Sequence, residues 1–193
     1  MLRADRLDVD RAMVLEIDIQ TALLPAIRNG EQVVQASRKL LEGVRVFEMP
    51  VLATEQYPKG IGATVEPVAQ CLEACKARII EKLTFSSCGE ERVREAILTI
   101  DRPQIVVIGI EAHVCVQQTV LDLLTMDYDV FVCADAVGSR GRTDYERALL
   151  RMQHAGALIT TVESALFELC ERCGTERFKG LLGVIKAFGP PEQ

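Results

Sequence analysis

The sequence lacks tryptophan altogether and contains only two histidines, and aromatic residues make up 5% of it. The histidines, His113 and His154, stand apart from each other, so we predict no metal site built on them. Basic residues do not cluster either, because lysine and arginine are spread along a chain whose formal net charge is -6 at pH 7. A protein that grips a nucleic-acid backbone needs a basic stripe, so we predict no nucleic-acid partner.

Long apolar runs are also missing. None approaches the roughly 20 residues that span a bilayer, and residues 1–8 are too charged for the core of a signal peptide. We therefore predict no membrane association and a cytoplasmic location. With 193 residues, of which 49% are hydrophobic, the chain can bury one sizeable core, and we predict a single domain over residues 1–193.

The seven cysteines are interpreted as reduced thiols, because their number is odd and no secretion signal is present. Cys170 and Cys173 have the spacing of a redox or zinc pair, but a four-ligand zinc site would need a second pair. We interpret them as a pair on a helix surface, and we predict neither a metal nor a cofactor.

Short apolar segments rich in β-branched residues alternate with longer segments of helical periodicity, and this alternation predicts an α/β fold. We expect a three-layer, doubly wound fold with a six-stranded parallel sheet. The expected strands are Ala12–Ile19, Pro50–Thr54, Arg78–Glu81, Gln104–Ile110, Asp129–Ala134 and Ala157–Thr161. The expected helices are Glu31–Gly43, Val68–Lys76, Glu90–Thr99, Val116–Met126, Tyr145–His154 and Ser164–Cys170, with one more near the C-terminus.

Within this pattern, Asn29 is a candidate cap for the first helix and Gly43 a candidate stop. The segment Glu55–Glu66 is punctuated by prolines and glycines and is too irregular for either element, so we predict a loop over the site. In open α/β sheets, ligands bind beyond the carboxyl ends of the strands, which directs attention to the residues that follow each strand.

The segment Val106–Thr119 runs from an apolar strand through a glycine and delivers Cys115 to the start of a helix. Unpaired N–H groups and the helix dipole favour a thiolate there, so Cys115 is the candidate nucleophile. Asp18 ends the first strand and Lys82 follows the third, so an acid, a base and a thiol come from three strand ends. Lys82 would stabilise both anions, and Asp18 would take the thiol proton and return it to a leaving group. His113 is expected to line the pocket rather than to act as the base.

These residues resemble the motifs of the isochorismatase-like cysteine hydrolase superfamily. The matching segments are Val14–Asp18, Lys82–Ser86 and Gly109–Thr119, and the last is the most specific. Two further segments, Glu55–Gly60 and Ala134–Arg140, resemble the branch of isochorismatase domain-containing proteins. The resemblance implies a Cys-Lys-Asp triad, a homo-oligomer and a cis peptide bond at Ile110–Glu111. The N–H groups of Glu111 and Cys115 would then face an oxyanion.

The resemblance also narrows the chemistry. Nicotinamidases of the superfamily carry an Asp/His metal cluster, but Thr54–Pro58 contains no histidine, so a metal-assisted reaction is disfavoured. Pathway isochorismatases commonly lack the cysteine, so Cys115 favours hydrolysis of a C–N bond in a small amide, carbamoyl or related substrate. The reaction would proceed through a thioester, in a pocket walled by Gln56, Tyr57, Phe85 and His113.

Two alternatives remain open at this stage. One is a binding or scaffold protein that keeps the fold but has little turnover. The other is a redox sensor at Cys115, with Cys88 or Cys133 approaching it in the fold. An apolar stripe of helical residues, interpreted as core rather than as a subunit contact, comprises Leu166, Phe167, Phe178, Leu181 and Leu182.

Overall fold

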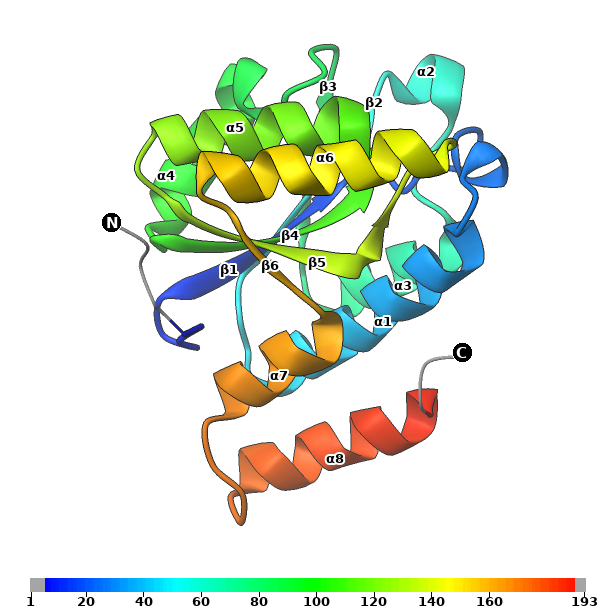
Figure 1. The fold of residues 1–193 in the computed structure, drawn as a ribbon. Coiled ribbons are helices and arrows are strands. Elements are labelled where there is room, and N and C mark those ends of the chain that lie inside the picture. The colour runs from blue at the N-terminus through cyan, green and yellow to red at the C-terminus, as the bar shows by residue number, and fades with distance from the viewer. Residues whose placement is uncertain (1–5, 190–193) are drawn as a thin grey trace.

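The computed structural model describes residues 6–189 and confirms an α/β fold on a six-stranded, all-parallel sheet (Figure 1). The strands are β1 (Ala12–Ile17), β2 (Val51–Gln56), β3 (Arg78–Lys82), β4 (Gln104–Ile110), β5 (Asp129–Gly138) and β6 (Leu158–Thr160). Their order in the sheet is β3-β2-β1-β4-β5-β6. The chain therefore winds outward from the middle in both directions, and the order reverses between β1 and β4, where a doubly wound sheet places its ligand site.

Helices cover both faces of the sheet (Figure 1). One face carries α1 (Gly30–Val46), α3 (Glu66–Ala74), α7 (Val162–Cys170) and α8 (Glu176–Phe188). The other carries α4 (Glu91–Ile100), α5 (Gln117–Thr125) and α6 (Arg142–Ala155). We call these the α1 face and the α5 face. Helix α8 lies outermost and packs against α1 and α7.

Alternation along the strands divides the core between the two faces. On β1, Ala12 and Val14 join the cluster of the α1 face, whereas Met13, Leu15 and Ile17 join the cluster of the α5 face. Successive side chains of a strand point to opposite sides, so each buried strand supplies both cores. This alternation decides which side chains can meet at the carboxyl edge.

Several expected boundaries shift for identifiable reasons. Helix α1 continues past Gly43 to Val46, because this glycine is needed for packing: a Cβ there would come within 2.3 Å of Leu166 Cδ2. Asn29 precedes α1, but its side chain makes no cap bond and instead donates to the Val137 carbonyl oxygen at 3.1 Å. The signals at both residues serve long-range contacts, which a local pattern does not reveal.

The expected loop Glu55–Glu66 is more regular than predicted. Strand β2 extends through Gln56, the short helix α2 (Pro58–Ile61) follows, and α3 already begins at Glu66. Only the residues between these elements form a true loop. Strand β5 is likewise longer than expected and carries a register irregularity opposite Val107–Gly109.

The apolar stripe of α7 and α8 is mainly core. Leu166 and Leu181 are fully buried, and Phe178 packs against the same cluster, whereas Phe167 is 41% exposed. Within residues 6–189, no helix combines the length and the hydropathy needed to cross a bilayer.

Candidate active site

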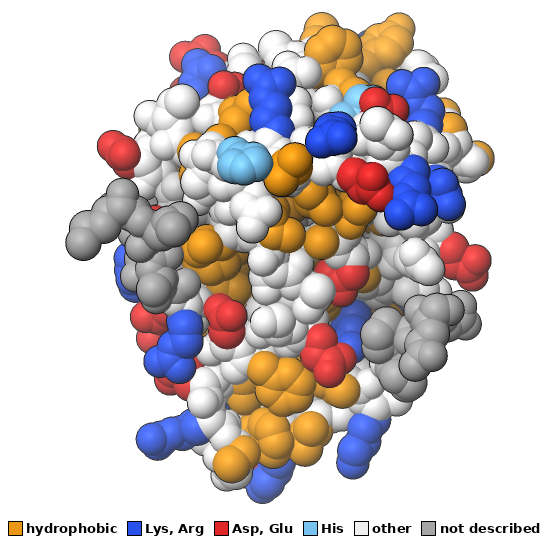
Figure 2. All heavy atoms as spheres, viewed as in Figure 1, with side chains coloured by type: hydrophobic (Ala, Val, Ile, Leu, Met, Phe, Trp, Pro, Cys, Tyr) orange, Lys and Arg blue, Asp and Glu red, His pale blue; other side chains and the backbone are white. Residues whose placement is uncertain are grey.

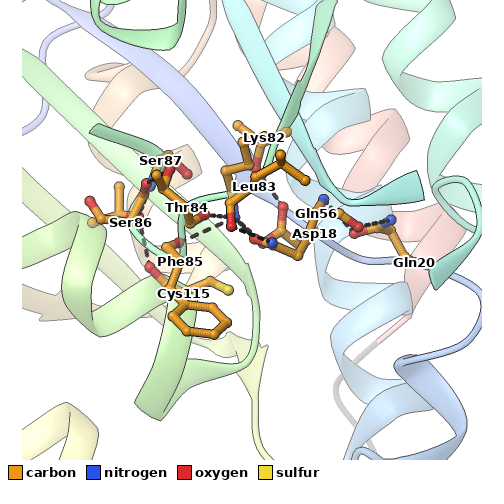
Figure 3. A network of polar contacts seen from close by, with 12 residues as sticks. Asp18, Gln20, Gln56, Lys82, Leu83, Thr84, Phe85, Ser86, Ser87 and Cys115 are labelled. Atoms are coloured by element: carbon orange, nitrogen blue, oxygen red, sulfur yellow. Dashed lines mark hydrogen bonds and ion pairs between the residues drawn. The ribbon is translucent and has the colours of Figure 1, made fainter. Parts of the chain in front are cut away.

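The predicted acid, lysine and thiol converge at the carboxyl edge of the sheet. Asp18 directly follows β1, Lys82 is the last residue of β3, and Cys115 lies in a turn after β4. Figure 3 shows the polar network that joins these strand ends. Strands β1 and β4 are neighbours at the point where the strand order reverses, so their carboxyl ends lie side by side where doubly wound sheets generally bind ligands.

Asp18 and Lys82 form an ion pair that is wholly removed from water. Lys82 Nζ lies 2.7 Å from Asp18 Oδ2, and neither side chain is exposed. Lys82 Nζ also donates to Gln56 Oε1 at 2.7 Å and approaches the carbonyl oxygens of Thr84 and Phe85 at 3.2 Å each. A buried ammonium group is tolerated only when its donors are used, and here four acceptors surround it. Lys82 is therefore a fixed cation beside the carboxylate.

The side chain of Asp18 reaches this cation because the backbone turns at Asp18. Its φ is 56°, in the left-handed region, and its carboxylate accepts a hydrogen bond from Thr54 Oγ1 at 2.8 Å. Burial raises the pKa of Asp18, and this rise is opposed by the charge of Lys82 and by the hydrogen bonds from Lys82 and Thr54. Asp18 is therefore a carboxylate that can accept a proton.

Cys115 lies in a π-helical turn, Ala112–Val116, that leads into α5. The carbonyl oxygen of Cys115 accepts a hydrogen bond from the Thr119 hydroxyl group at 2.7 Å. The oxygen of the same hydroxyl group accepts a hydrogen bond from the Ser87 N–H at 2.8 Å. These bonds tie the turn after β4 to the segment after β3. Gly109 just upstream must be glycine, because its φ is 135° and a Cβ would come within 2.1 Å of the Ile17 carbonyl oxygen.

The protonation state of Cys115 differs from the expectation of a thiolate. Burial raises the pKa of the Cys115 thiol to about 12, and the Asp18 carboxylate raises it further, while the Lys82 ammonium lowers it. The side chain is only 5% exposed, so loss of water outweighs the favourable potential at the helix start. The resting residue is a neutral thiol, and its pKa responds to both the Asp18 carboxylate and the Lys82 ammonium. The proton must leave during the reaction.

The Ile110–Glu111 peptide bond is cis. Glu111 is 9% exposed, and its Oε2 is paired with Arg140 Nε at 2.9 Å. Arg140 follows β5, so this ion pair bridges the ends of two adjacent strands. The Arg140 side chain is 62% exposed, so the ion pair is screened by solvent and mainly holds the turn after β4 in place.

The four expected pocket residues have different surroundings. Tyr57 and Phe85 are exposed, whereas Gln56 is buried and donates its amide N–H to the Leu83 carbonyl oxygen at 3.0 Å. Gln56 also solvates Lys82, so it is part of the buried network and not a free pocket wall. His113 is half-buried, with Nδ1 3.0 Å from Ser139 Oγ.

Sequence reasoning missed three buried polar residues near Asp18. Thr54 bonds its carboxylate, and Gln20 bonds the backbone of Gln56 with both ends of its amide, at 2.8 and 3.0 Å. Glu16 is fully buried on β1, two residues before Asp18. The sequence could have pointed to Glu16 and Gln20, because each is a polar residue in or just after a segment that is otherwise apolar.

The remaining cysteines limit the redox interpretation. Cys133 belongs to the core of the α1 face and Cys115 to that of the α5 face, so the sheet separates them. Cys88 shares the α5 face but is buried, and burial raises its pKa to about 12. Cys170 is buried while Cys173 is exposed, so they are not the expected surface pair. Among residues 6–189, no three or more Asp, Glu, His or Cys side chains are grouped to hold a metal.

Comparisons with known proteins agree with this fold. A model of the isochorismatase domain matches residues 12–164. Isochorismatase domain-containing protein 1 of Salmo salar is 36% identical over 174 residues, which are 90% of this chain but only 60% of that relative's length. The secreted isochorismatase effector Isc1 of Phytophthora sojae is 37% identical over 188 residues, covering 95% of this chain and 89% of the effector.

Three solved structures are similar over nearly the whole chain. The MAR1 ribonuclease of Caenorhabditis elegans has a TM-score of 0.89 and 33% identity, over 94% of this chain and 93% of its own. YcaC of Pseudomonas aeruginosa, with hexane-2,5-diol and covalent acrylamide, has a TM-score of 0.88 and 26% identity, over 97% and 96%. The Escherichia coli YcaC gene product, an octameric hydrolase of unknown specificity, has a TM-score of 0.88 and 25% identity, over 95% and 92%.

Proposed function

Because the chain belongs to the isochorismatase family of hydrolases, we propose that it is a cysteine hydrolase that cleaves a C–N bond in a small amide, carbamoyl or related compound. The observation that carries the proposal is the buried ion pair between the Asp18 carboxylate and the Lys82 ammonium, both of which act on the pKa of the Cys115 thiol. A nucleophile, a proton acceptor and a fixed cation gathered at one edge of the sheet are the parts that acyl transfer to a thiol requires.

The first step is proton transfer from Cys115 Sγ to Asp18. Burial raises the pKa of both groups, so the proton moves between two groups that each resist ionisation. The thiolate that forms beside Lys82 attacks the substrate carbonyl carbon, a C–S bond forms, and negative charge develops on the carbonyl oxygen. The N–H groups of Glu111 and Cys115 would hold this oxyanion.

Collapse of the tetrahedral intermediate breaks the C–N bond, and Asp18 returns the proton to the departing nitrogen. The enzyme is left as a thioester. Water then gives its proton to Asp18 and attacks the thioester carbon, and Cys115 leaves with that proton as the neutral thiol. Lys82 stays charged throughout, so its task is to hold Asp18 and to stabilise the transient thiolate.

Covalent acrylamide on a YcaC relative makes acrylamide a suitable probe for this chain. The test is intact-mass spectrometry of the wild-type protein, Cys115→Ala and Cys173→Ala after incubation with acrylamide and a panel of small amides. We expect adducts or products that disappear in Cys115→Ala and persist in Cys173→Ala, the control that loses the exposed thiol. Turnover that survives in Cys115→Ala would overturn the mechanism, and a lack of any Cys115-dependent product would favour a scaffold protein.

RNA is a second candidate substrate, favoured by the similarity to a MAR1 ribonuclease. The net charge of -6 opposes binding of a long phosphate backbone, and the proposed chemistry needs a carbonyl carbon. Incubation of labelled RNA with wild-type protein and Cys115→Ala decides between them. Cleavage that is abolished in the variant would replace the amide substrate with RNA.

A homo-oligomer is also proposed, supported by the octameric E. coli relative. Figure 2 shows apolar side chains gathered over α7 and α8, where Phe167 is exposed, and Tyr57, Leu83 and Phe85 are exposed near the site. Sedimentation velocity should give a mass well above 21.3 kDa. The cytoplasmic location likewise remains a proposal, since one relative is a secreted effector.

A further inference from the structure

Glu16 is a buried acid that the proposed mechanism does not use. It lies on the central strand β1, opposite Ala53 of β2 and Ile108 of β4, and it is fully buried. Because β1 alternates, Glu16 points to the α1 face, as Ala12 and Val14 do. The Cys115 thiol lies on the opposite face.

The carboxyl group of Glu16 makes one hydrogen bond. Its Oε1 accepts from the Ile19 N–H at 2.9 Å, and its Oε2 has no partner among the residues that the structure describes. The Ile19 N–H belongs to the peptide unit that immediately follows Asp18. Glu16 therefore holds the backbone immediately C-terminal to Asp18, the residue that faces Lys82.

The direction of Asp18 depends on this backbone. Simple alternation along β1 would send Asp18 to the α1 face with Glu16, away from Lys82. The left-handed φ of 56° instead turns its carboxylate toward Thr54 and Lys82. Residues other than glycine adopt this conformation uncommonly, and aspartate is among those that tolerate it best.

We propose that Glu16 is a positioning residue, which holds the turn at Asp18 through the Ile19 N–H and thereby keeps the Asp18 carboxylate against Lys82 and Cys115. The proposal rests on the function assigned to Asp18 above. Glu16 does not touch the thiol or the substrate. It acts through the backbone from the opposite face of the sheet.

Burial, more than the charges around it, explains why Glu16 acts as a neutral acceptor. Burial raises its pKa to about 8, the Ile19 N–H lowers it, and the carboxylates of Asp18 and Glu55 raise it, while Lys82 lowers it more weakly. Glu55 is itself bonded to the N–H and hydroxyl of Thr64 at 2.7 and 2.8 Å. A neutral carboxyl group keeps one oxygen as acceptor for Ile19 and holds its proton on the other.

The experiment is the pH profile of Cys115 alkylation by iodoacetamide, read by peptide mass spectrometry. The Asp18 charge raises the pKa of Cys115, so any change that moves or removes this carboxylate should shift the profile to lower pH. Asp18→Asn sets the size of the full shift. In Glu16→Met we expect most of this shift, with Cys115 alkylated about tenfold faster than in the wild type at pH 8. Glu16→Gln keeps an oxygen that can accept from the Ile19 N–H, so its profile should match that of the wild type.

Two internal controls separate positioning from loosening of the fold. Cys88 is buried to the same extent as Cys115 on the same face, so faster labelling of both would indicate local opening. Cys173 is exposed and should react equally in every variant. Glu55→Gln is the matched control, because it removes a carboxylate near Glu16 without touching the Ile19 bond. If Glu16→Met does not fold, Glu16→Leu takes its place.

The outcomes distinguish the two proposals. An unshifted profile in Glu16→Met beside a shifted one in Asp18→Asn would overturn the role of Glu16 and leave the hydrolase standing. Equal shifts in Glu16→Met and Glu16→Gln would also overturn it, since the acceptor would not matter. An unshifted Asp18→Asn would overturn both, whereas missing Cys115-dependent hydrolysis with the expected shifts would overturn only the hydrolase.

Discussion

Strand β1 delivers two buried carboxyl groups two residues apart, and the two faces of the sheet treat them differently. On the α5 face, Asp18 meets a lysine ammonium at 2.7 Å and a threonine hydroxyl at 2.8 Å. On the α1 face, Glu16 meets a single backbone N–H and the repulsion of Asp18 and Glu55. Loss of hydration is similar for both, so the difference lies in the partners.

The comparison shows how this fold uses charge. The face that carries Cys115 keeps an anion and a cation in contact, which is what proton transfer from a thiol needs. The face behind it holds an acid that burial keeps neutral, which is what a rigid support needs. Both conditions follow from whether a cation lies within reach, and each can be changed by substitution.

The largest effect is expected when the cation is removed. Lys82→Met leaves Asp18 buried without its partner, and we expect a loss of about 3 to 5 kcal/mol in the free energy of unfolding. Urea denaturation at pH 7 measures it. Lys39→Met is the matched control, since Lys39 is also buried but its partner Glu163 is half exposed, and we expect a loss of about 1 kcal/mol or less.

A double variant sharpens this result. Asp18→Asn removes the stranded charge, so Asp18→Asn/Lys82→Met should recover much of the stability that Lys82→Met loses. Equal instability of the double and single variants would mean that Lys82 contributes by packing rather than by charge.

The sequence predicted where the candidate site residues lie, but not how their side chains are oriented or protonated. Apolar strands and their ends located Asp18, Lys82 and Cys115, because burial of a parallel sheet leaves a continuous apolar pattern. The side-chain direction of Asp18 did not follow, because it depends on one backbone torsion. The protonation of Cys115 did not follow either, because the depth of burial is set by residues distant in sequence.

The fold shows the same division. The six strands and their covering helices were predictable from periodicity, whereas Gly43 was misjudged as a helix stop. Its role is to let Leu166 of α7 approach α1, and nothing in the local sequence distinguishes that role from a stop signal. Gln56 was predicted as a pocket wall, and its bond with Lys82 was not foreseen, because that bond joins two strands that are distant in sequence.

A second prediction tests the neutral carboxyl group by its effect on stability. Because the folded-state pKa of Glu16 is raised from 4.5 to about 8, the folded chain binds more protons than the unfolded chain between these values. Stability from Glu16 is therefore complete below about pH 4.5 and is lost as the pH rises toward 8. We expect a loss on the order of 3 kcal/mol between pH 5 and 8 from this group.

The measurement compares urea unfolding of wild type and Glu16→Gln across this pH range. The variant cannot ionise, so its stability should gain on that of the wild type as the pH rises. The charged groups that face Glu16 are Asp18, Glu55 and Lys82. Because the Glu55 carboxylate raises the pKa of Glu16, Glu55→Gln should move the end of this stability loss to lower pH, whereas Glu16→Gln should abolish the loss altogether. Parallel pH curves for wild type and Glu16→Gln would show that Glu16 does not hold a proton in the fold.

The smallest effect is expected from the hydrogen bond that complements the ion pair. Thr54→Val removes the hydroxyl group that donates to Asp18 but leaves Lys82 in place, so we expect a loss of about 1 kcal/mol in urea unfolding. Thr64→Val is the control, because it removes the hydroxyl group that donates to Glu55. Glu55 is partly exposed and still accepts a hydrogen bond from the Thr64 N–H, so the loss in the free energy of unfolding should be smaller than in Thr54→Val. Because Lys82 still holds Asp18, the alkylation profile of Cys115 in Thr54→Val should stay close to wild type. A shift as large as that of Asp18→Asn would mean that the threonine, rather than the lysine, directs Asp18 toward the thiol.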